Sequence, residues 1–172
     1  MKNLCYLKNI ILFVSLILLA GCGFHLRSAE SLPPEFHTIY LQTANEYGEF
    51  EVTFKRALKA SGVVVTDDID QAKLRLILTS NYNYTTTSAA TSNQARVYSL
   101  TYLATIYATD KNGKTILKLK STSVTRSVAL APDEVYESSN QITIVKHEMQ
   151  QELVNRLFNI LSSQQTFNEL AT

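Results

Sequence analysis

The chain has 172 residues, a length that suits a single domain, and it carries 16 Lys and Arg against 15 Asp and Glu. Its first 21 residues contain 15 of the hydrophobic residues and two of the lysines, which leaves 14 Lys and Arg against 15 Asp and Glu in the remainder. A remainder so close to neutral argues against a nucleic-acid-binding protein that depends on a large basic field. We therefore expect one globular domain behind a targeting segment.

Residues 1–21 have the features of a signal peptide. Two lysines begin the segment, and the apolar run over residues 10–20 is about half the ~20 residues that a membrane-spanning helix needs. The run ends in Leu19-Ala20-Gly21-Cys22, which resembles the bacterial lipobox, where the Cys thiol receives diacylglycerol before cleavage. A plain secretory signal with an incidental cysteine is the alternative. The motif predicts that Cys22 is the lipidation site and carries an S-diacylglycerol group and an N-acyl chain.

The cysteine count agrees with a lipid anchor at Cys22. The other cysteine, Cys5, lies within the signal peptide, so the mature chain would have one thiol and no disulfide. A triacylated terminus should hold durably to a membrane, whereas a single myristoyl chain binds only marginally. By the usual lipoprotein sorting rule, Gly23 in place of Asp after the cysteine predicts export to the cell outer membrane.

The mature chain begins with a tether, and a strand and a helix follow it. Residues 22–37 are expected to be a lipidated N-terminus and tether, and residues 38–162 a single α/β domain. The composition of residues 38–43 is typical of a strand. Apolar residues at helical spacing predict a helix over residues 49–61, which Gly62 ends. A short valine run and an acidic turn come next, and we expect the turn's carboxylates to be solvated and not to bind a metal.

Three long segments then alternate apolar and polar residues with the period of a β-strand. They are residues 73–84, 96–109 and 115–130. Residues 85–94 are rich in Thr, Ser, Asn and Ala and are expected to form a polar hairpin tip. Asn112-Gly113 predicts a tight turn between the second and third strands. The apolar parity of the third strand changes midway, which predicts a β-bulge.

The last predicted element is a long helix of about seven turns. Pro132 suits its first turn, and apolar residues recur at helical spacing up to Leu161. Residues 163–172 are expected to be a frayed tail. The resulting order is β-α-β-β-β-α, which predicts an α/β two-layer sandwich with two helices on one face of a mixed four-stranded sheet. The other face would be polar and available.

No arrangement of residues in the sequence points to catalysis. The three histidines are far apart, and there is neither a glycine-rich phosphate loop nor a Gly-x-Ser-x-Gly elbow. His147 is expected to be exposed on the last helix. We therefore interpret the chain as a binding or structural protein without a metal, a cofactor or an enzymatic activity.

Basic residues on the long strands are the candidate ligand-binding groups. Clustered Lys and Arg on a strand face suit phosphates, and Arg offers bidentate geometry. Alternation places Lys118, Lys120 and Arg126 on one nominal parity, although the expected bulge could separate Arg126 from the other two. Edge lysines that discourage aggregation are the alternative. The candidate phosphate-binding residues are Arg96, Lys118, Lys120 and Arg126.

Several of these segments together resemble one family, the LPS-assembly lipoproteins of the LptE type. The resemblance is most specific at the start of the mature chain and otherwise follows order and spacing along nearly the whole domain. It is carried by Cys22-Gly23-Phe24-His25-Leu26-Arg27, the strand containing Tyr98, Val124-Thr125-Arg126-Ser127, Ile144-Val145-Lys146, Glu148-Met149 and Arg156-Leu157.

The resemblance implies an outer-membrane lipoprotein that plugs the lumen of the LPS-translocating β-barrel LptD and helps to deliver lipopolysaccharide (LPS) to the outer leaflet. It also implies that basic side chains bind LPS phosphates. The chain departs from some family members because it has no Lys or Arg between Arg126 and Lys146. We expect residues 85–94 and the strand tyrosines Tyr82 and Tyr84 to contact the barrel, with an ordinary solvated hairpin as the alternative.

Two other functions compete with this interpretation. An auxiliary lipoprotein of a lipid-transport ABC system would also have a small α/β domain behind a lipobox, and it would bind lipid or a transporter instead of a barrel. A lipid-anchored hydrolase lacks a candidate nucleophile and base in this sequence. Co-purification with a large β-barrel would separate the first two classes.

Overall fold

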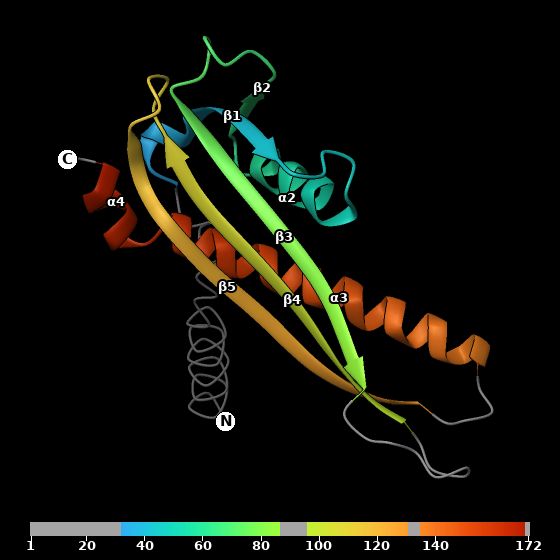
Figure 1. The fold of residues 1–172 in the computed structure, drawn as a ribbon. Helices are drawn as coiled ribbons and strands as arrows, with labels where there is room; N and C mark the ends of the chain where they lie inside the picture. Colours follow the sequence, from blue (N-terminus) through green and yellow to red (C-terminus); the bar gives the residue numbers. More distant parts are fainter. Residues whose placement is uncertain (1–31, 87–95, 131–134, 171–172) are drawn as a thin grey trace, which may run out of the picture.

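A computed structural model describes residues 32–86, 96–130 and 135–170 (Figure 1). The predicted signal peptide, the predicted lipidation site Cys22, most of the predicted hairpin tip and Pro132 lie outside these residues. No helix in the described part of the chain is long and apolar enough to cross a membrane. What the structure describes is the domain that the sequence predicted between residues 38 and 162, with short additions at both ends.

The elements agree closely with the sequence predictions for the first helix and the long strands. In chain order they are the 3-10 helix η1 (Pro34–His37), β1 (Thr38–Thr43), α2 (Glu49–Ala60), β2 (Val64–Thr66), β3 (Leu74–Thr86), β4 (Arg96–Thr109), β5 (Thr115–Leu130), α3 (Val135–Leu161) and α4 (Gln164–Leu170). Glycines occupy the two predicted stops with positive φ angles, Gly62 at 84° behind α2 and Gly113 at 85° in the β4–β5 turn.

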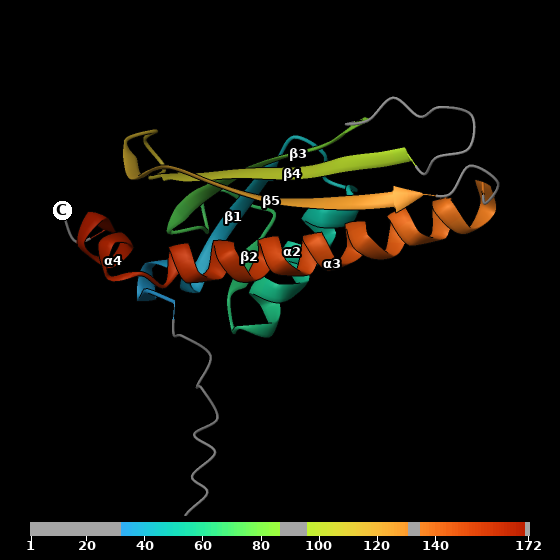
Figure 2. The same cartoon turned by 90° about the horizontal axis from the view of Figure 1, so that it is seen from below.

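The sheet is mixed, as expected, but it has five strands in the order β2-β1-β3-β4-β5 and not four. β1 is parallel to β2 and to β3, whereas β3, β4 and β5 are antiparallel. The additional strand, β2, has only three residues, too few for alternation to reveal it in the sequence. Both long helices cover the same face of the sheet, as Figure 2 shows.

The core lies between the sheet and these two helices. Along β4 the even-numbered residues from Leu100 to Ala108 are buried, and their odd-numbered neighbours are not. From α2, the fully buried Phe50 and Phe54 pack against them, and the Phe50 ring lies 5.3 Å from the Tyr102 ring. Over residues 140–161, α3 buries the apolar side chains of Met149, Leu153, Val154, Leu157 and Leu161 and the polar side chain of Gln150.

The predicted bulge is present, and it lies at the start of β5. Ile106 pairs with Lys120, and Ala108 pairs with Leu117, so that two residues of β5 lie opposite the single residue between them on β4. The extra residue shifts the parity, which is why Leu117 and Val124 are both buried beneath the helices. As a consequence, Lys120 shares the helix-facing side with Val124.

The C-terminal segment differs from the frayed tail expected from the sequence. Residues 164–170 form α4, where Thr166 is fully buried and its hydroxyl donates a hydrogen bond of 2.7 Å to the Ile160 carbonyl. Glu169 connects the helix to β5 through hydrogen bonds to Lys118 and Lys120. The helix is too short and polar for apolar periodicity to reveal it, and tertiary contacts hold it in place.

Candidate functional site

The sheet face without helices is a candidate interaction surface of the described chain. Alternation directs the odd-numbered residues of the long strands away from the core, and none of those in 77–85, 97–109 and 121–129 is charged. We call this the open face. The hydroxyl and amide side chains on it are Thr79, Asn81, Asn83, Thr85, Ser99, Thr101, Thr105, Tyr107, Thr109, Ser121, Ser123, Thr125 and Ser127.

Cross-strand hydrogen bonds order part of the open face. Thr79 and Thr105 share a hydroxyl–hydroxyl hydrogen bond, and the hydroxyls of Thr101 and Thr125 lie 3.4 Å apart. A hydroxyl both donates and accepts, so these side chains can also bond to a partner. The open face therefore offers many neutral hydrogen-bonding groups on a rigid sheet.

The four candidate cations do not form one cluster. Arg96 begins β4 opposite Leu130, Arg126 lies opposite Leu100, and Lys120 lies opposite Ile106. Lys120 and Arg126 are six positions apart along β5, which corresponds to roughly 20 Å at the rise of an extended strand. The sequence had left open a bulge that separates Arg126 from the two lysines. In the structure the bulge lies before Lys120, so it separates Lys118 from Lys120 and Arg126.

Two of these cations bind acidic residues on the helices. Lys120 Nζ lies 2.7 Å from Glu169 Oε1, and both side chains are mostly buried. This hydrogen bond is the main reason why the pKa of Glu169 lies below its ordinary value of 4.5. Arg126 forms a salt bridge with Glu152 of α3, and the same carboxylate accepts a 2.7 Å hydrogen bond from Arg156. Lys120 and Arg126 thus connect the sheet to the helices.

Arg96 and Lys118 have exposed side chains and form no salt bridge with any residue that the structure describes. Arg96 lies at the end of the strands that is next to the predicted hairpin tip, and Lys118 lies toward the β4–β5 turn. Their charges remain available to a ligand, at opposite ends of the long strands.

A second polar group, which the sequence did not reveal, joins α2 to α3. Lys146 Nζ lies 2.9 Å from Glu49 Oε2, and His147 Nδ1 lies 4.0 Å from the other carboxylate oxygen. The Lys146 hydrogen bond lowers the pKa of Glu49, and in turn Glu49 raises the pKa of Lys146. Deeper, Ser80 donates a 2.6 Å hydrogen bond to Glu51, whose side chain is 5% exposed. The sequence contains no signal for these pairs, because they join residues far apart in the chain.

Tyr82 and Tyr84 lie on the helix-facing side of the sheet and not on the open face. The Tyr82 ring lies 5.3 Å from the Tyr102 ring, and Lys146 Nζ lies 5.7 Å above the centre of the Tyr82 ring. Burial raises the pKa of Tyr82. Tyr84, which is 61% exposed and next to Tyr98, remains accessible at the end of the strands. Of the two tyrosines expected to contact a partner, only Tyr84 has most of its surface available.

Metal binding finds no support in the part of the chain that the structure describes. No group of three or more His, Cys, Asp or Glu residues is arranged there to hold a metal ion. His147 is exposed on α3, as the sequence predicted. The acidic turn after β2 is held by its own hydrogen bonds, such as that from Gln71 Nε2 to Asp68 Oδ2 at 3.0 Å.

Comparisons with known proteins place this architecture in one family. The family model described as "LptE: Lipopolysaccharide-assembly" matches residues 36–161. The LPS-assembly lipoprotein LptE of Pectobacterium atrosepticum is 30% identical, over 95% of this chain and 91% of the relative. The protein of the same name from Photorhabdus laumondii is 27% identical, over 87% and 81%.

Solved structures share the fold at low sequence identity. Rare lipoprotein B from Shewanella oneidensis is similar with a TM-score of 0.63 and 16% identity, over 77% of this chain and 98% of the other. The solution structure of an uncharacterized lipoprotein B from Nitrosomonas europaea has a TM-score of 0.63 and 18% identity, over 81% and 90%. These two comparisons support the fold, and the family match supports the relationship.

Proposed function

Because this chain belongs to the LptE family, we propose that it is a lipid-anchored outer-membrane protein that plugs and supports the assembly of the LPS-translocating β-barrel LptD. It binds LPS during insertion into the outer leaflet. The observation that carries the proposal is the family match over residues 36–161, which spans the described domain from η1 to the end of α3. The auxiliary ABC-transport lipoprotein is not favoured, because the family and the named relatives belong to LPS assembly.

The open face suits contact with the inside of a barrel. The lumen of an outer-membrane barrel is polar, so a partner that fills it needs hydrogen-bonding groups. Burying an unpaired charge costs far more than burying a hydroxyl that finds a partner. The open face presents hydroxyls and amides without charge, whereas the outer side of α2 exposes Arg56 and Lys59. We therefore place the barrel wall against the open face.

Co-purification tests the partner, and crosslinking tests the orientation. The tagged full chain, extracted from outer membranes in detergent, should bring down a large β-barrel protein; recovery without one would contradict the proposal. A photocrosslinking residue at Asn81 or Ser123 on the open face should capture the barrel more efficiently than one at Arg56 or Lys59. Crosslinks confined to α2 would reject this orientation while leaving the partnership intact.

LPS phosphates are the proposed ligands of the cations that form no salt bridge with a described residue, and Arg96 is the exposed candidate on the side of the predicted tip. Replacing Arg96 with Gln should weaken LPS binding roughly tenfold, the value of one charge-assisted hydrogen bond. The matched control is Arg56→Gln, which removes the same charge from the outside of α2 and should leave binding unchanged. Equal affinities for the two variants would reject Arg96 as an LPS ligand.

The lipid anchor requires a test of its own, because residues 1–31 lie outside the described structure. Mass spectrometry of the mature chain should find an N-terminus at Cys22 carrying a diacylglycerol and an acyl chain. The variant Cys22→Ser should retain its signal peptide, because the lipoprotein signal peptidase cleaves only after the cysteine is modified. A mature chain with a free thiol at Cys22 would reject the anchor. No catalytic step is part of this function.

A further inference from the structure

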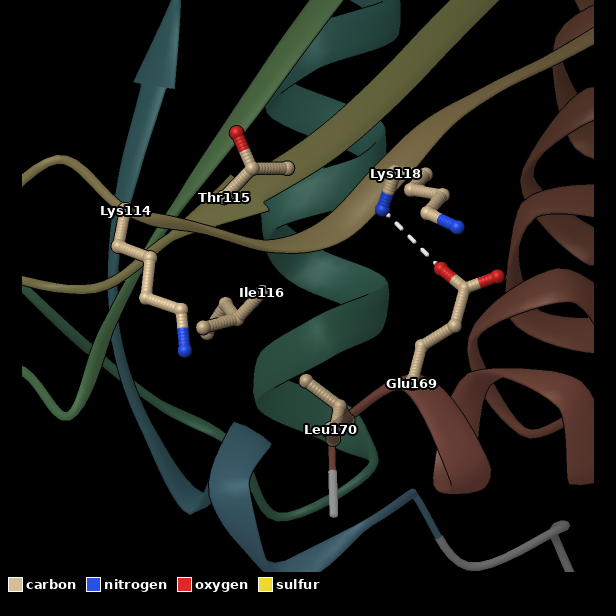
Figure 3. Close-up of a pocket in the computed structure, with 6 residues that line it drawn as sticks. All are labelled: Lys114, Thr115, Ile116, Lys118, Glu169 and Leu170. Atoms are coloured by element: carbon tan, nitrogen blue, oxygen red, sulfur yellow. Dashed lines mark hydrogen bonds between the residues drawn. The ribbon is translucent and has the colours of Figure 1, made fainter. Parts of the chain in front are cut away.

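A half-open pocket lies between the start of β5 and the end of α4. It has a volume of about 270 Å³, slightly below the range of sites for drug-sized ligands. The residues that line it are Lys114, Thr115, Ile116, Lys118, Glu169 and Leu170 (Figure 3). From these we propose that the pocket binds the headgroup of an anionic glycerophospholipid in the membrane leaflet that holds the lipid anchor. This inference rests on the lipid anchor of the proposed function.

The pocket combines cations with an apolar floor. Ile116 and Leu170 are partly buried and pack against the core, and Figure 3 shows Ile116 between Lys114 and Lys118, with Leu170 below it near Glu169. Lysine ammonium groups bind phosphate as point charges, while the apolar floor suits the carbon atoms that join a phosphate to its acyl chains. A ligand that is both anionic and partly apolar matches this combination better than a free inorganic ion does.

The one acidic side chain in the lining, Glu169, interacts chiefly with Lys120 and more weakly with the charge of Lys118. Glu169 lies 2.7 Å from Lys120 Nζ, and it also accepts a 3.1 Å hydrogen bond from the Lys118 backbone N–H. Lys120 therefore offsets the charge of Glu169. The nearby Asp110 is occupied too, because its Oδ1 accepts hydrogen bonds of 2.8 Å from the backbone N–H groups of Asn112 and Lys114.

The position of the pocket identifies the membrane as the source of the ligand. Arg75, at the start of β3, pairs with Thr109, next to the β4–β5 turn, and β1 begins at the same end. The described chain also begins at this end, where Leu32 packs against the core. Figure 1 shows η1, in blue, and α4 at this same end of the sheet. Cys22 precedes Leu32 by ten residues, a span of at most ~35 Å. Arg96 lies at the other end of the strands, so the two candidate anion sites are separate.

The test uses the full lipidated chain inserted into vesicles of phosphatidylcholine, with or without an equal part of phosphatidylglycerol. Acetylation of each lysine is followed by mass spectrometry. We expect Lys114 and Lys118 to react about fivefold more slowly in the anionic vesicles, because the attraction of one lysine to an anionic membrane surface typically corresponds to a factor of about this size. Lys55 and Lys59 on α2 should react equally in both. Equal rates at Lys114 and Lys118 in the two vesicle types would overturn the proposal.

Two further arms distinguish the sources of the phosphate. Inorganic phosphate added to phosphatidylcholine vesicles should give no protection; if it protects Lys114 and Lys118 as well as the lipid does, the pocket is a free-anion site. Protection by purified LPS but not by phosphatidylglycerol would overturn this inference and support the proposed function instead. A chain that floats with neither vesicle type would reject the anchor, and with it the membrane as the source.

A variant tests whether the two lysines act together. Lys118→Gln keeps the backbone N–H that bonds to Glu169 but removes the charge, so Lys114 should lose most of its protection in anionic vesicles. Lys59→Gln removes one charge from α2 and should leave the protection of Lys114 unchanged. Full protection of Lys114 in the Lys118→Gln variant would overturn a shared site.

Discussion

The pairing of Arg126 with Glu152 decides whether this arginine is chiefly a structural residue. Arg126 was a candidate phosphate ligand, but in the structure it contacts a carboxylate of α3 that also binds Arg156. Glu152→Gln removes the charge and keeps the size of the side chain. The two arginines then lose their shared partner, while Arg156 retains its 2.6 Å hydrogen bond to the Ser123 carbonyl.

The expected loss of stability is modest, because both arginines are partly in solvent. The side chains of Arg126 and Arg156 are 49% and 47% exposed, and that of Glu152 is 31% exposed. Such pairs contribute about 0.2 to 1 kcal/mol each, so Glu152→Gln should lower the free energy of unfolding by about 1 kcal/mol. At the urea dependence typical of small domains, the unfolding midpoint should fall by roughly 0.5 M.

A double-mutant cycle isolates the interaction itself. Urea unfolding of the full chain in nonionic detergent, followed by circular dichroism, is compared for wild type, Arg126→Gln, Glu152→Gln and the double variant. The coupling between the two changes should be about 0.5 kcal/mol. The control cycle uses Lys55 and Asp67, a pair 3.6 Å apart whose Asp side chain is 92% exposed, and it should show almost no coupling. A coupling no larger than that of the control would refute the structural role of Arg126.

Three further predictions concern the core, a turn and the acid range. Phe54 of α2 is fully buried and its ring lies against the ring of Phe158 on α3. Phe54→Ala should therefore lower the free energy of unfolding in urea by about 3 to 5 kcal/mol, and a loss under 1 kcal/mol would contradict the packing. Gly62→Ala should cost about 1 kcal/mol from its φ of 84° alone, since no atom lies within 4 Å of the added methyl group, and an unchanged midpoint would refute a strained turn. Because the pKa of Glu169 is lowered from 4.5, its contribution to stability should be present above about pH 4.5 and lost as the pH falls through the folded-state pKa. Lys120→Met should therefore reduce the difference in unfolding free energy between pH 7 and pH 3, and an unchanged difference would show that this pair does not set the acid response.

The sequence predicted much of the fold because the controlling signals are local. The alternation in β4 located its two ends, and the glycine behind α2 located the end of that helix. The parity change in β5 predicted the bulge. In each case one side of the segment is buried and the other is exposed. The order of apolar and polar residues within that single segment is therefore enough to reveal the element.

The candidate site was less predictable, because its chemistry depends on contacts across the chain. Lys120 and Glu169 are 49 residues apart, and Arg126 and Glu152 are 26 residues apart. The alternation of apolar and polar residues along β5 could suggest that these cations lie on one face of the strand. It could not give the position of the bulge, nor show which carboxylates of the helices contact the cations. The three-residue β2 and the polar α4 were missed because both are too short for the period of apolar residues to reveal them.

The sequence by itself determined the lipoprotein-like start, the two-layer order of strands and helices, and a polar sheet face opposite the helices. Each of these follows from composition and from the period of apolar residues, which local geometry imposes. Only the tertiary structure decided that Lys120 and Arg126 bind helix carboxylates, and that Lys114 and Lys118 flank an apolar pocket at the tethered end. The reason is physical: an ion pair or a pocket forms where the packed core places side chains from distant segments, and this placement is fixed only once the whole sheet and its helices come together.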